Sequence, residues 1–143
     1  MTVGADAGAL LQRVVDIAAA AGREIMEVYG RSYNIEQKDD RSPLTEADMA
    51  AHHVIVAGLA ALEPRLPVLS EEEADIGHAE RARWREYWLV DPLDGTREFI
   101  KRNGEFTVNI ALIRDHRPVM GVITVPVTGV CYYASAGRGA YRQ

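Results

Sequence analysis

The chain has 143 residues, a formal net charge of -5 and a pI near 5.4. This acidic balance argues against a protein that binds nucleic-acid polymers, which would normally display a basic face. With 48% hydrophobic and 26% charged residues, the composition suits one globular domain that buries roughly two-thirds of its unfolded surface. The single cysteine, Cys131, excludes an internal disulfide, fits a reducing compartment and is expected in the core of a strand.

Targeting signals are not evident in the sequence. The longest apolar run, residues 54–62, is too short to cross a membrane. Residues 1–6 lack the charged-then-apolar pattern of a secretory signal. We therefore expect a cytoplasmic protein without a transmembrane segment.

The first helix is predicted at residues 7–29, where apolar side chains recur at spacings of three and four along one face. Gly30 is expected to end it. Residues 33–36 alternate apolar and polar side chains like a short strand, and residues 37–43 follow as a polar loop of mixed charge.

A second helix is predicted from Thr45 to about Leu62. Thr45 and Asp48 have the spacing of a capping box, in which Asp48 would return a hydrogen bond to the backbone. The adjacent His52 and His53 would point in different directions on this helix, so they are poor joint metal ligands. We expect both at the surface or partly buried.

The stretch at residues 87–96 (YWLVDPLDGT) is an apolar run that ends abruptly in two carboxylates, a glycine and a hydroxyl. Its first half has the pattern of a buried strand. Because Pro92 has no backbone N–H, the strand ladder is expected to stop there. Gly95 permits backbone angles or close approaches that a side chain would obstruct. Asp91 and Asp94 would then share one turn, about 4 to 6 Å apart.

A cation is the simplest way to make two such carboxylates compatible. At an effective dielectric of about 20, a like-charge pair roughly 4 Å apart costs on the order of 4 kcal/mol. The candidate ligands are all oxygens, because the Thr96 hydroxyl and the Leu93 carbonyl lie beside the carboxylates. This donor set favours Mg²⁺, Mn²⁺ or Ca²⁺ over zinc. The alternative is a turn in which Asp91 and Asp94 only cap backbone N–H groups.

A second acidic element, residues 67–73 (PVLSEEE), repeats the design of a short apolar strand that runs into carboxylates. If the strands around Val68 and Trp88 are neighbours in one sheet, Glu71 and Asp91 emerge at the same edge. The alternative is a solvated acidic first turn of a helix, which the helix dipole favours. We favour the helical turn for Glu72 and Glu73, and Glu71 as an additional metal ligand.

After the acidic centre the pattern changes to antiparallel strands. A meander is predicted with strands at residues 107–114, 119–125 and 130–135, turns at 115–118 and 126–129, and a last strand begun at 140–143. Helices followed by a run of strands predict an α+β fold, with two helices packed on one face of a largely antiparallel sheet. A strand begun at the last residues leaves an edge exposed, which suggests that more protein is attached.

Three motifs resemble, in order and spacing, those of the inositol monophosphatase superfamily of Mg²⁺-dependent, lithium-sensitive phosphatases: LTEAD at 44–48, SEE at 70–72 and DPLDGT at 91–96. The continuation at 97–110 is similar to the CysQ branch of 3'(2'),5'-bisphosphate nucleotidases, except that Arg97 replaces an expected lysine. The resemblance implies that this chain is the N-terminal, metal-binding half of a sugar-phosphatase-type fold. The C-terminal α/β domain of the family is absent from it.

The resemblance also implies a metal site. Glu71, Asp91 and the Leu93 carbonyl would hold one Mg²⁺, and Asp91 and Asp94 would share in a second, with two or three ions bound in all. Asp91 would bridge the ions. Two cations so placed can activate water and stabilise the leaving oxygen of an in-line displacement.

Roles in catalysis follow from the same resemblance. Thr96 would orient the attacking water, and Asp48 would accept a proton through the Thr96 hydroxyl, so that Asp48, Glu71 and Thr96 form the catalytic set. Backbone N–H groups of Gly95 and Thr96, if they open a helix, would receive phosphate oxygens. The substrate-binding residues implied are Glu71, Leu93, Asp94, Gly95 and Thr96.

The implied activity is hydrolysis of a small-molecule phosphate monoester, with 3'-phosphoadenosine 5'-phosphate converted to AMP and phosphate. An inositol-1-monophosphatase or a sugar-bisphosphate phosphatase is the close alternative. A hypothesis of another class is a catalytically incomplete metal-binding fragment that acts as an assembly module. The resemblance is compatible with a homodimer and with peripheral association with the inner membrane.

Five further side chains near the motifs are candidates for the core, for solvent or for substrate contact. Trp84, Trp88 and Phe99 are assigned to the core rather than to a base-stacking platform. Lys101 and Arg102 either contact a second phosphate or lie in solvent, and we favour solvent.

Overall fold

The computed structural model describes residues 7–31, 42–71 and 76–143. Its elements in chain order are α1 (Ala7–Arg31), α2 (Pro43–Ala60), β1 (Val68–Ser70), α3 (His78–Arg81), β2 (Glu86–Asp94), α4 (Thr96–Lys101), β3 (Thr107–Arg114), β4 (Arg117–Thr124), β5 (Cys131–Ser135) and β6 (Ala140–Arg142). The predicted strand at 33–36 and most of the predicted loop after it lie outside the described residues.

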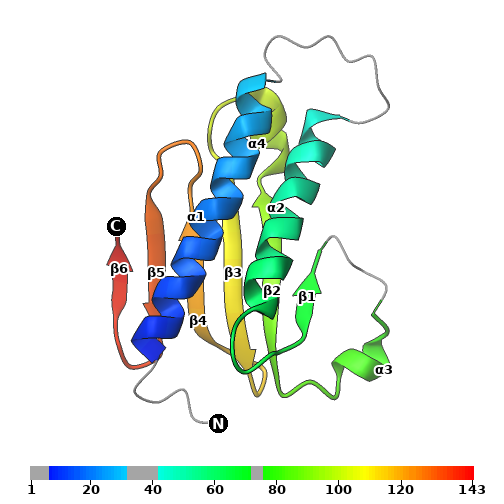
Figure 1. Cartoon of the computed structure of the whole chain (residues 1–143), viewed down its shortest axis with the longest axis vertical. Coiled ribbons are helices and arrows are strands. Elements are labelled where there is room, and N and C mark those ends of the chain that lie inside the picture. The colour runs from blue at the N-terminus through cyan, green and yellow to red at the C-terminus, as the bar shows by residue number, and fades with distance from the viewer. Residues whose placement is uncertain (1–6, 32–41, 72–75) are drawn as a thin grey trace.

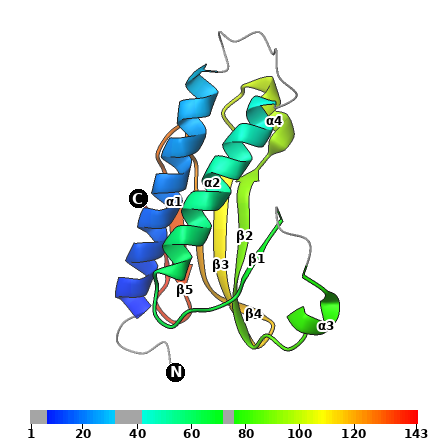
Figure 2. The ribbon, with the colours of Figure 1, turned by 45° about the vertical axis from the view of Figure 1, so that its right-hand side comes forward.

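One six-stranded sheet has its strands in sequence order, from β1 at one edge to β6 at the other. β1 is parallel to β2, and every other neighbouring pair is antiparallel. α1 and α2 lie side by side across one face of this sheet (Figure 1, Figure 2). The predicted α+β architecture, with two helices on one face of a largely antiparallel sheet, is confirmed.

The core lies between the helix pair and the sheet. Buried side chains come from both helices and from alternate positions of β2, β3 and β4, among them Val14, Ile25, Ile55, Leu59, Trp88, Val90, Val108, Ile110, Leu112 and Val122. The core assignments of Trp88, Phe99 and Cys131 are confirmed, with exposed fractions of 1%, 3% and 7%. The core assignment of Trp84 is wrong, because this residue is only half-buried, with its ring centroid 5.7 Å from that of Tyr87.

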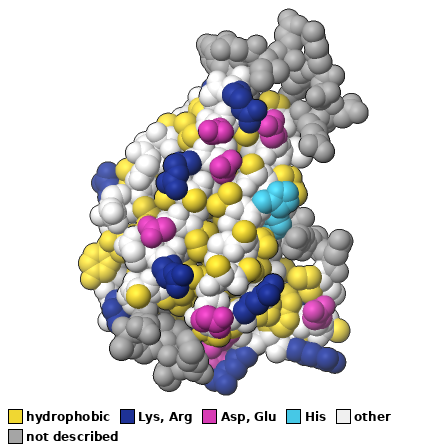
Figure 3. Space-filling model, in the orientation of Figure 1, with side chains coloured by type: hydrophobic (Ala, Val, Ile, Leu, Met, Phe, Trp, Pro, Cys, Tyr) yellow, Lys and Arg dark blue, Asp and Glu magenta, His cyan; other side chains and the backbone are white. Residues whose placement is uncertain are grey.

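The first helix continues past Gly30, so the predicted end at that residue is wrong. Gly30 is helical, and a Cβ added there would meet no neighbouring atom within 4 Å. The helix ends at Arg31, whose Nη2 donates to Glu46 Oε1 of α2 at 2.8 Å. The outer face of the helix pair carries basic and acidic side chains interspersed with apolar ones (Figure 3).

Gly58 lets α2 approach α1 closely. A Cβ added at Gly58 would lie 2.8 Å from Ile17 Cγ1 and 3.0 Å from its Cδ1. Gly58→Ala should therefore destabilise the protein by about 1 kcal/mol, because overpacking exceeds the gain in helix propensity. Gly30→Ala is the matched control and should stabilise by roughly 0.5–1 kcal/mol, because only the propensity term remains. Urea denaturation measures both, and a stabilising Gly58→Ala would disprove the close approach.

The β3–β4 connection is tighter than predicted. β4 begins at Arg117, so the turn consists of Asp115 and His116 rather than residues 115–118. Their φ angles of 49° and 65° are both positive, as in the two-residue hairpin turns whose twist matches that of the flanking strands.

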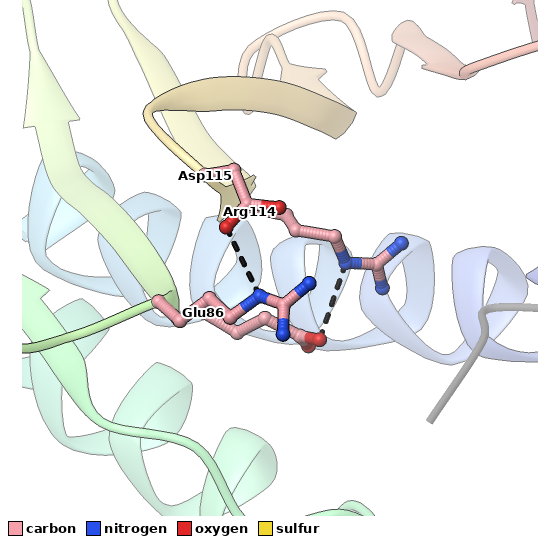
Figure 4. Close-up of polar contacts among 4 residues, drawn as sticks. Glu86, Arg114 and Asp115 are labelled. Atoms are coloured by element: carbon pink, nitrogen blue, oxygen red, sulfur yellow. Dashed lines mark hydrogen bonds and ion pairs between the residues drawn. The ribbon is translucent and has the colours of Figure 1, made fainter.

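Two ion pairs lie at this end of the sheet (Figure 4). Arg114 Nε donates to Glu86 Oε1 at 3.2 Å across the β2–β3 ladder, where the two residues are directly opposite. Arg85 Nε donates to Asp115 Oδ1 at 3.0 Å in a more exposed pair. A cross-strand pair such as Glu86–Arg114 contributes roughly 0.2–1 kcal/mol, so this pair helps to set the register of β2 on β3.

Candidate metal and phosphate site

β1 and β2 bring the two acidic segments together at the carboxyl ends of these strands. They are parallel, with Val68 opposite Trp88 and Ser70 opposite Val90. One residue further on, the Glu71 amide donates to the Val90 carbonyl at 3.3 Å. The prediction that these strands are neighbours is confirmed, and the backbone of Glu71 lies beside the Val90–Asp91 peptide.

The prediction that β2 stops at Pro92 is wrong, because the strand continues to Asp94. Asp91 pairs with Asn109 and Asp94 pairs with Thr107, and the register shifts between these pairs. β2 therefore has one more residue than β3 in this interval, which makes a β-bulge. Because Pro92 falls inside the bulge, its missing N–H removes no ladder bond and the strand can resume.

Asp94 is exposed, but its carboxylate is held by a neighbouring amide. Asn109 Nδ2 donates to Asp94 Oδ2 at 3.0 Å, and Thr107 Oγ1 donates to Asn109 Oδ1 at 2.8 Å. This chain of side chains from β3 orients the carboxylate. Asn109 was not predicted as a site residue. The one feature of the sequence that could have indicated it is a polar side chain on the face of β3 opposite the core.

Gly95 occupies the backbone conformation that the sequence indicated. Its φ of 98° is in the left-handed region, and it caps α4, the helix that begins at Thr96. An added Cβ would lie 3.0 Å from the Glu105 carbonyl oxygen and 3.2 Å from Phe106 Cα. Both the angle and the close approach exclude a larger residue, so the turn between Asp94 and Thr96 depends on this glycine.

Asp48 is not a capping residue, so that prediction is wrong. Ser42 is the N-cap of α2, and its Oγ accepts from the Thr45 amide at 3.1 Å. Pro43 follows at the first helical position, where its fixed φ favours a helix start. Asp48 consequently lies in the second turn, half-buried with its Oδ1 enclosed. α2 contacts α4, the helix that Thr96 begins.

Of the two predictions for the adjacent histidines, one is corrected and one is confirmed. His52 is 2% exposed, and so fully buried rather than at the surface or partly buried, because it lies on the sheet-facing side of α2 and bonds to Ser70. His53 is exposed, as expected.

Arg102 lies neither in solvent nor towards a site. Its Cζ stands 4.0 Å from the centroid of the Tyr29 ring, and its Nη2 donates to the Tyr29 carbonyl at 2.9 Å. The cation–π contact and the hydrogen bond tie the end of α4 to α1. Lys101 is exposed, as favoured.

The donor atoms at the carboxyl ends of β1 and β2 suit a hard divalent cation. Glu71, Asp91 and Asp94 offer carboxylate oxygens, and the backbone adds the Leu93 carbonyl. Glu71 and Asp94 are exposed and Asp91 is half-buried. Within residues 7–31, 42–71 and 76–143, no three His, Cys, Asp or Glu side chains are gathered closely enough to hold a metal ion. Glu72 and Glu73 lie outside the described residues. The backbone therefore brings the acidic ends of β1 and β2 together, and the set of metal ligands stays a prediction.

Comparison with known proteins adds independent evidence. The chain is 54% identical over 131 residues to the 3'(2'),5'-bisphosphate nucleotidase CysQ of Salmonella typhimurium, which covers 90% of this chain and 53% of that protein. It is 48% identical over 134 residues to the CysQ of Aggregatibacter actinomycetemcomitans, which covers 94% and 50%. The crystal structure of CysQ from Bacteroides thetaiotaomicron superimposes with a TM-score of 0.84 at 46% identity, over 99% of this chain and 51% of that one.

The chain therefore spans about half the length of the relatives it matches. No helix in the described part of the chain has both the length and the apolar character needed to cross a membrane. The model of the inositol monophosphatase family matches residues 8–143, nearly the whole chain. On this match, and on the shared fold, the chain belongs to the inositol monophosphatase family.

Proposed function

We propose that this chain is the N-terminal, metal-binding part of a phosphomonoesterase that converts 3'-phosphoadenosine 5'-phosphate to AMP and phosphate. The observation that carries the proposal is the parallel β1–β2 pair, in which the bond from the Glu71 amide to the Val90 carbonyl sets two acidic segments side by side. The nucleotidase names of relatives 48% and 54% identical support the substrate class.

The proposed ligands of Mg²⁺ are Glu71, Asp91, the Leu93 carbonyl and Asp94, with two or three ions bound. When bound, the ions supply the positive charge that phosphoryl transfer requires around the reacting phosphate. The chain's own contribution is to orient the ligands. The Asn109 amide holds one carboxylate oxygen of Asp94, and the other oxygen, which has no hydrogen bond from the described residues, would face a cation.

Thr96 and Asp48 are proposed to handle the proton. The Thr96 hydroxyl, at the first residue of α4, would orient the attacking water, and Asp48 of α2 would accept a proton through that hydroxyl. The amides of Gly95 and Thr96 would donate to phosphate oxygens, and the left-handed conformation of Gly95 turns the chain at that point. Because positioning and charge neutralisation suffice, no covalent nucleophile is needed.

Phosphate release from a substrate panel tests the proposal. The panel contains 3'-phosphoadenosine 5'-phosphate, inositol 1-phosphate and fructose 1,6-bisphosphate, assayed with the 143-residue chain and with the chain joined to any natural C-terminal continuation. We expect kcat/KM to be highest for the nucleotide by at least about tenfold, a discrimination within the range of a few lost polar contacts. Preference for inositol 1-phosphate would overturn the nucleotidase assignment. Metal binding without hydrolysis in either form would favour the assembly-module hypothesis.

The domain arrangement is part of the same proposal. Leu89, Ile123 and Tyr132, from three strands, are 41%, 46% and 45% exposed on the sheet face opposite the helices. Apolar side chains on an uncovered sheet face favour a covering partner. We propose that the present chain forms one cytoplasmic domain and that a C-terminal α/β domain, such as the relatives' additional length could supply, covers this face. A homodimer is the alternative cover.

A further inference from the structure

His52 is a polar side chain within the apolar, buried face of α2. The buried residues of this helix are Ala47, Ala51, His52, Ile55 and Leu59. Burying an imidazole among apolar groups is costly unless its nitrogens find hydrogen-bond partners. His52 Nδ1 lies 3.0 Å from the Oγ of Ser70, and both side chains are only 2% exposed. The two residues are thus matched across the interface between α2 and β1.

The hydrogen bond between His52 and Ser70 lies close in sequence to two proposed site residues, Asp48 and Glu71. His52 follows Asp48 by one helical turn, so the two lie on the same side of α2. Ser70 is the last residue of β1 and directly precedes Glu71. The bond therefore joins the helix that carries the proposed proton acceptor to the strand end that carries a proposed metal ligand.

β1 is held by few hydrogen bonds of its own, so the bond between His52 and Ser70 would stabilise its position. It has three residues, lies at the edge of the sheet and pairs with a single neighbour in parallel. Short parallel ladders have few hydrogen bonds and are less stable per residue than antiparallel ones. The bond from the Glu71 amide to Val90, at 3.3 Å, is long for an N–H···O bond. The ladder alone therefore fixes Glu71 weakly.

We propose that His52 is a positioning residue, whose buried hydrogen bond to Ser70 holds the end of β1 against α2 and so places Glu71 beside Asp91. The consequence for metal binding rests on the proposed function. The placement of Glu71 is a property of this chain alone, and the two can be tested separately.

Amide hydrogen exchange at Glu71 tests the placement. His52→Leu and Ser70→Ala each remove the bond, whereas His52→Asn puts an amide group close to the position of Nδ1. We expect the Glu71 amide to exchange about tenfold faster in His52→Leu and Ser70→Ala, as for the loss of one buried hydrogen bond, and to recover most of its protection in His52→Asn. The Ala136 amide, which donates to Val119 at 2.9 Å on the far side of the sheet, is the internal control.

Three results would overturn the inference. These are unchanged Glu71 exchange in both variants that lack the bond, equal acceleration at Glu71 and Ala136, and a His52→Asn variant as fast as His52→Leu. Ser70→Ala changes little volume, so it decides the question even if His52→Leu does not fold.

Mn²⁺ binding, followed by the electron paramagnetic resonance signal of the free ion, tests the consequence at the site. Loss of a supporting hydrogen bond typically weakens metal affinity by about 10–100-fold, so we expect the lower part of that range in His52→Leu and Ser70→Ala, and recovery in His52→Asn. In the turnover assay, the same variants should lower kcat and raise the Mg²⁺ requirement, with KM for the nucleotide within about twofold of the parent. If the parent chain binds no Mn²⁺, the proposed metal site fails, while Glu71 exchange still decides the role of His52.

Discussion

Asp94→Asn should lower phosphate release by at least about 10²-fold, with little change in the free energy of unfolding. The side chain is exposed, so its packing contributes little to stability. Its main described contact is the hydrogen bond that one oxygen accepts from Asn109 Nδ2 at 3.0 Å. An asparagine keeps an oxygen that can accept this bond and removes the negative charge, which isolates the proposed role as a metal ligand.

A matched control for the charge change is Asp16→Asn. Asp16 is also exposed and also accepts a side-chain amide hydrogen bond, from Gln12 Nε2 at 3.0 Å, but it lies on α1. This variant should retain full activity. Turnover is measured as phosphate release by the chain, joined to any natural C-terminal continuation, and stability by urea denaturation. Retained turnover in Asp94→Asn would remove Asp94 from the site.

Trp88→Ala should destabilise the protein by about 3–5 kcal/mol, as large-to-small core substitutions of aromatic residues do. Trp88 is 1% exposed in the middle of β2, beneath the helix pair. Its register partner in β1 is Val68. A domain of this size is typically stable by about 5–15 kcal/mol, so this one substitution would remove much of the total.

Trp88→Phe should cost much less than Trp88→Ala. The indole Nε1 is buried and has no hydrogen-bond partner among the described residues, so phenylalanine removes no hydrogen bond and leaves a smaller cavity. Trp84→Ala is the control for loss of an indole at a half-buried position. It should destabilise the protein less than Trp88→Ala does. Urea denaturation of the three variants gives the order, and a Trp88→Ala variant as stable as Trp84→Ala would contradict the core assignment.

Local patterns accounted for most of the elements. Apolar periodicity located α1, and alternation located β3 and the meander, because burial of one face repeats along each element and is visible in the sequence. The left-handed Gly95 was indicated by its neighbours in the turn. The start of α2 was misplaced because Thr45 and Asp48 fit one local rule while Ser42 and Pro43 fit another, and only the observed cap decides between them.

The sequence by itself determined the existence of the two long helices, the strand order of the meander and the acidic motifs, since each depends on residues close together in the chain. Only the tertiary structure decided which polar side chains meet. The pairs His52 with Ser70, Asn109 with Asp94 and Arg102 with Tyr29 are separated by 18, 15 and 73 residues. The His52–Ser70 bond forms because the packing of α2 on β1 buries both polar atoms, and burial makes a partner necessary. The exposed Asn109–Asp94 bond and the part-buried Arg102–Tyr29 bond form because the fold brings groups that are distant in sequence within hydrogen-bond distance.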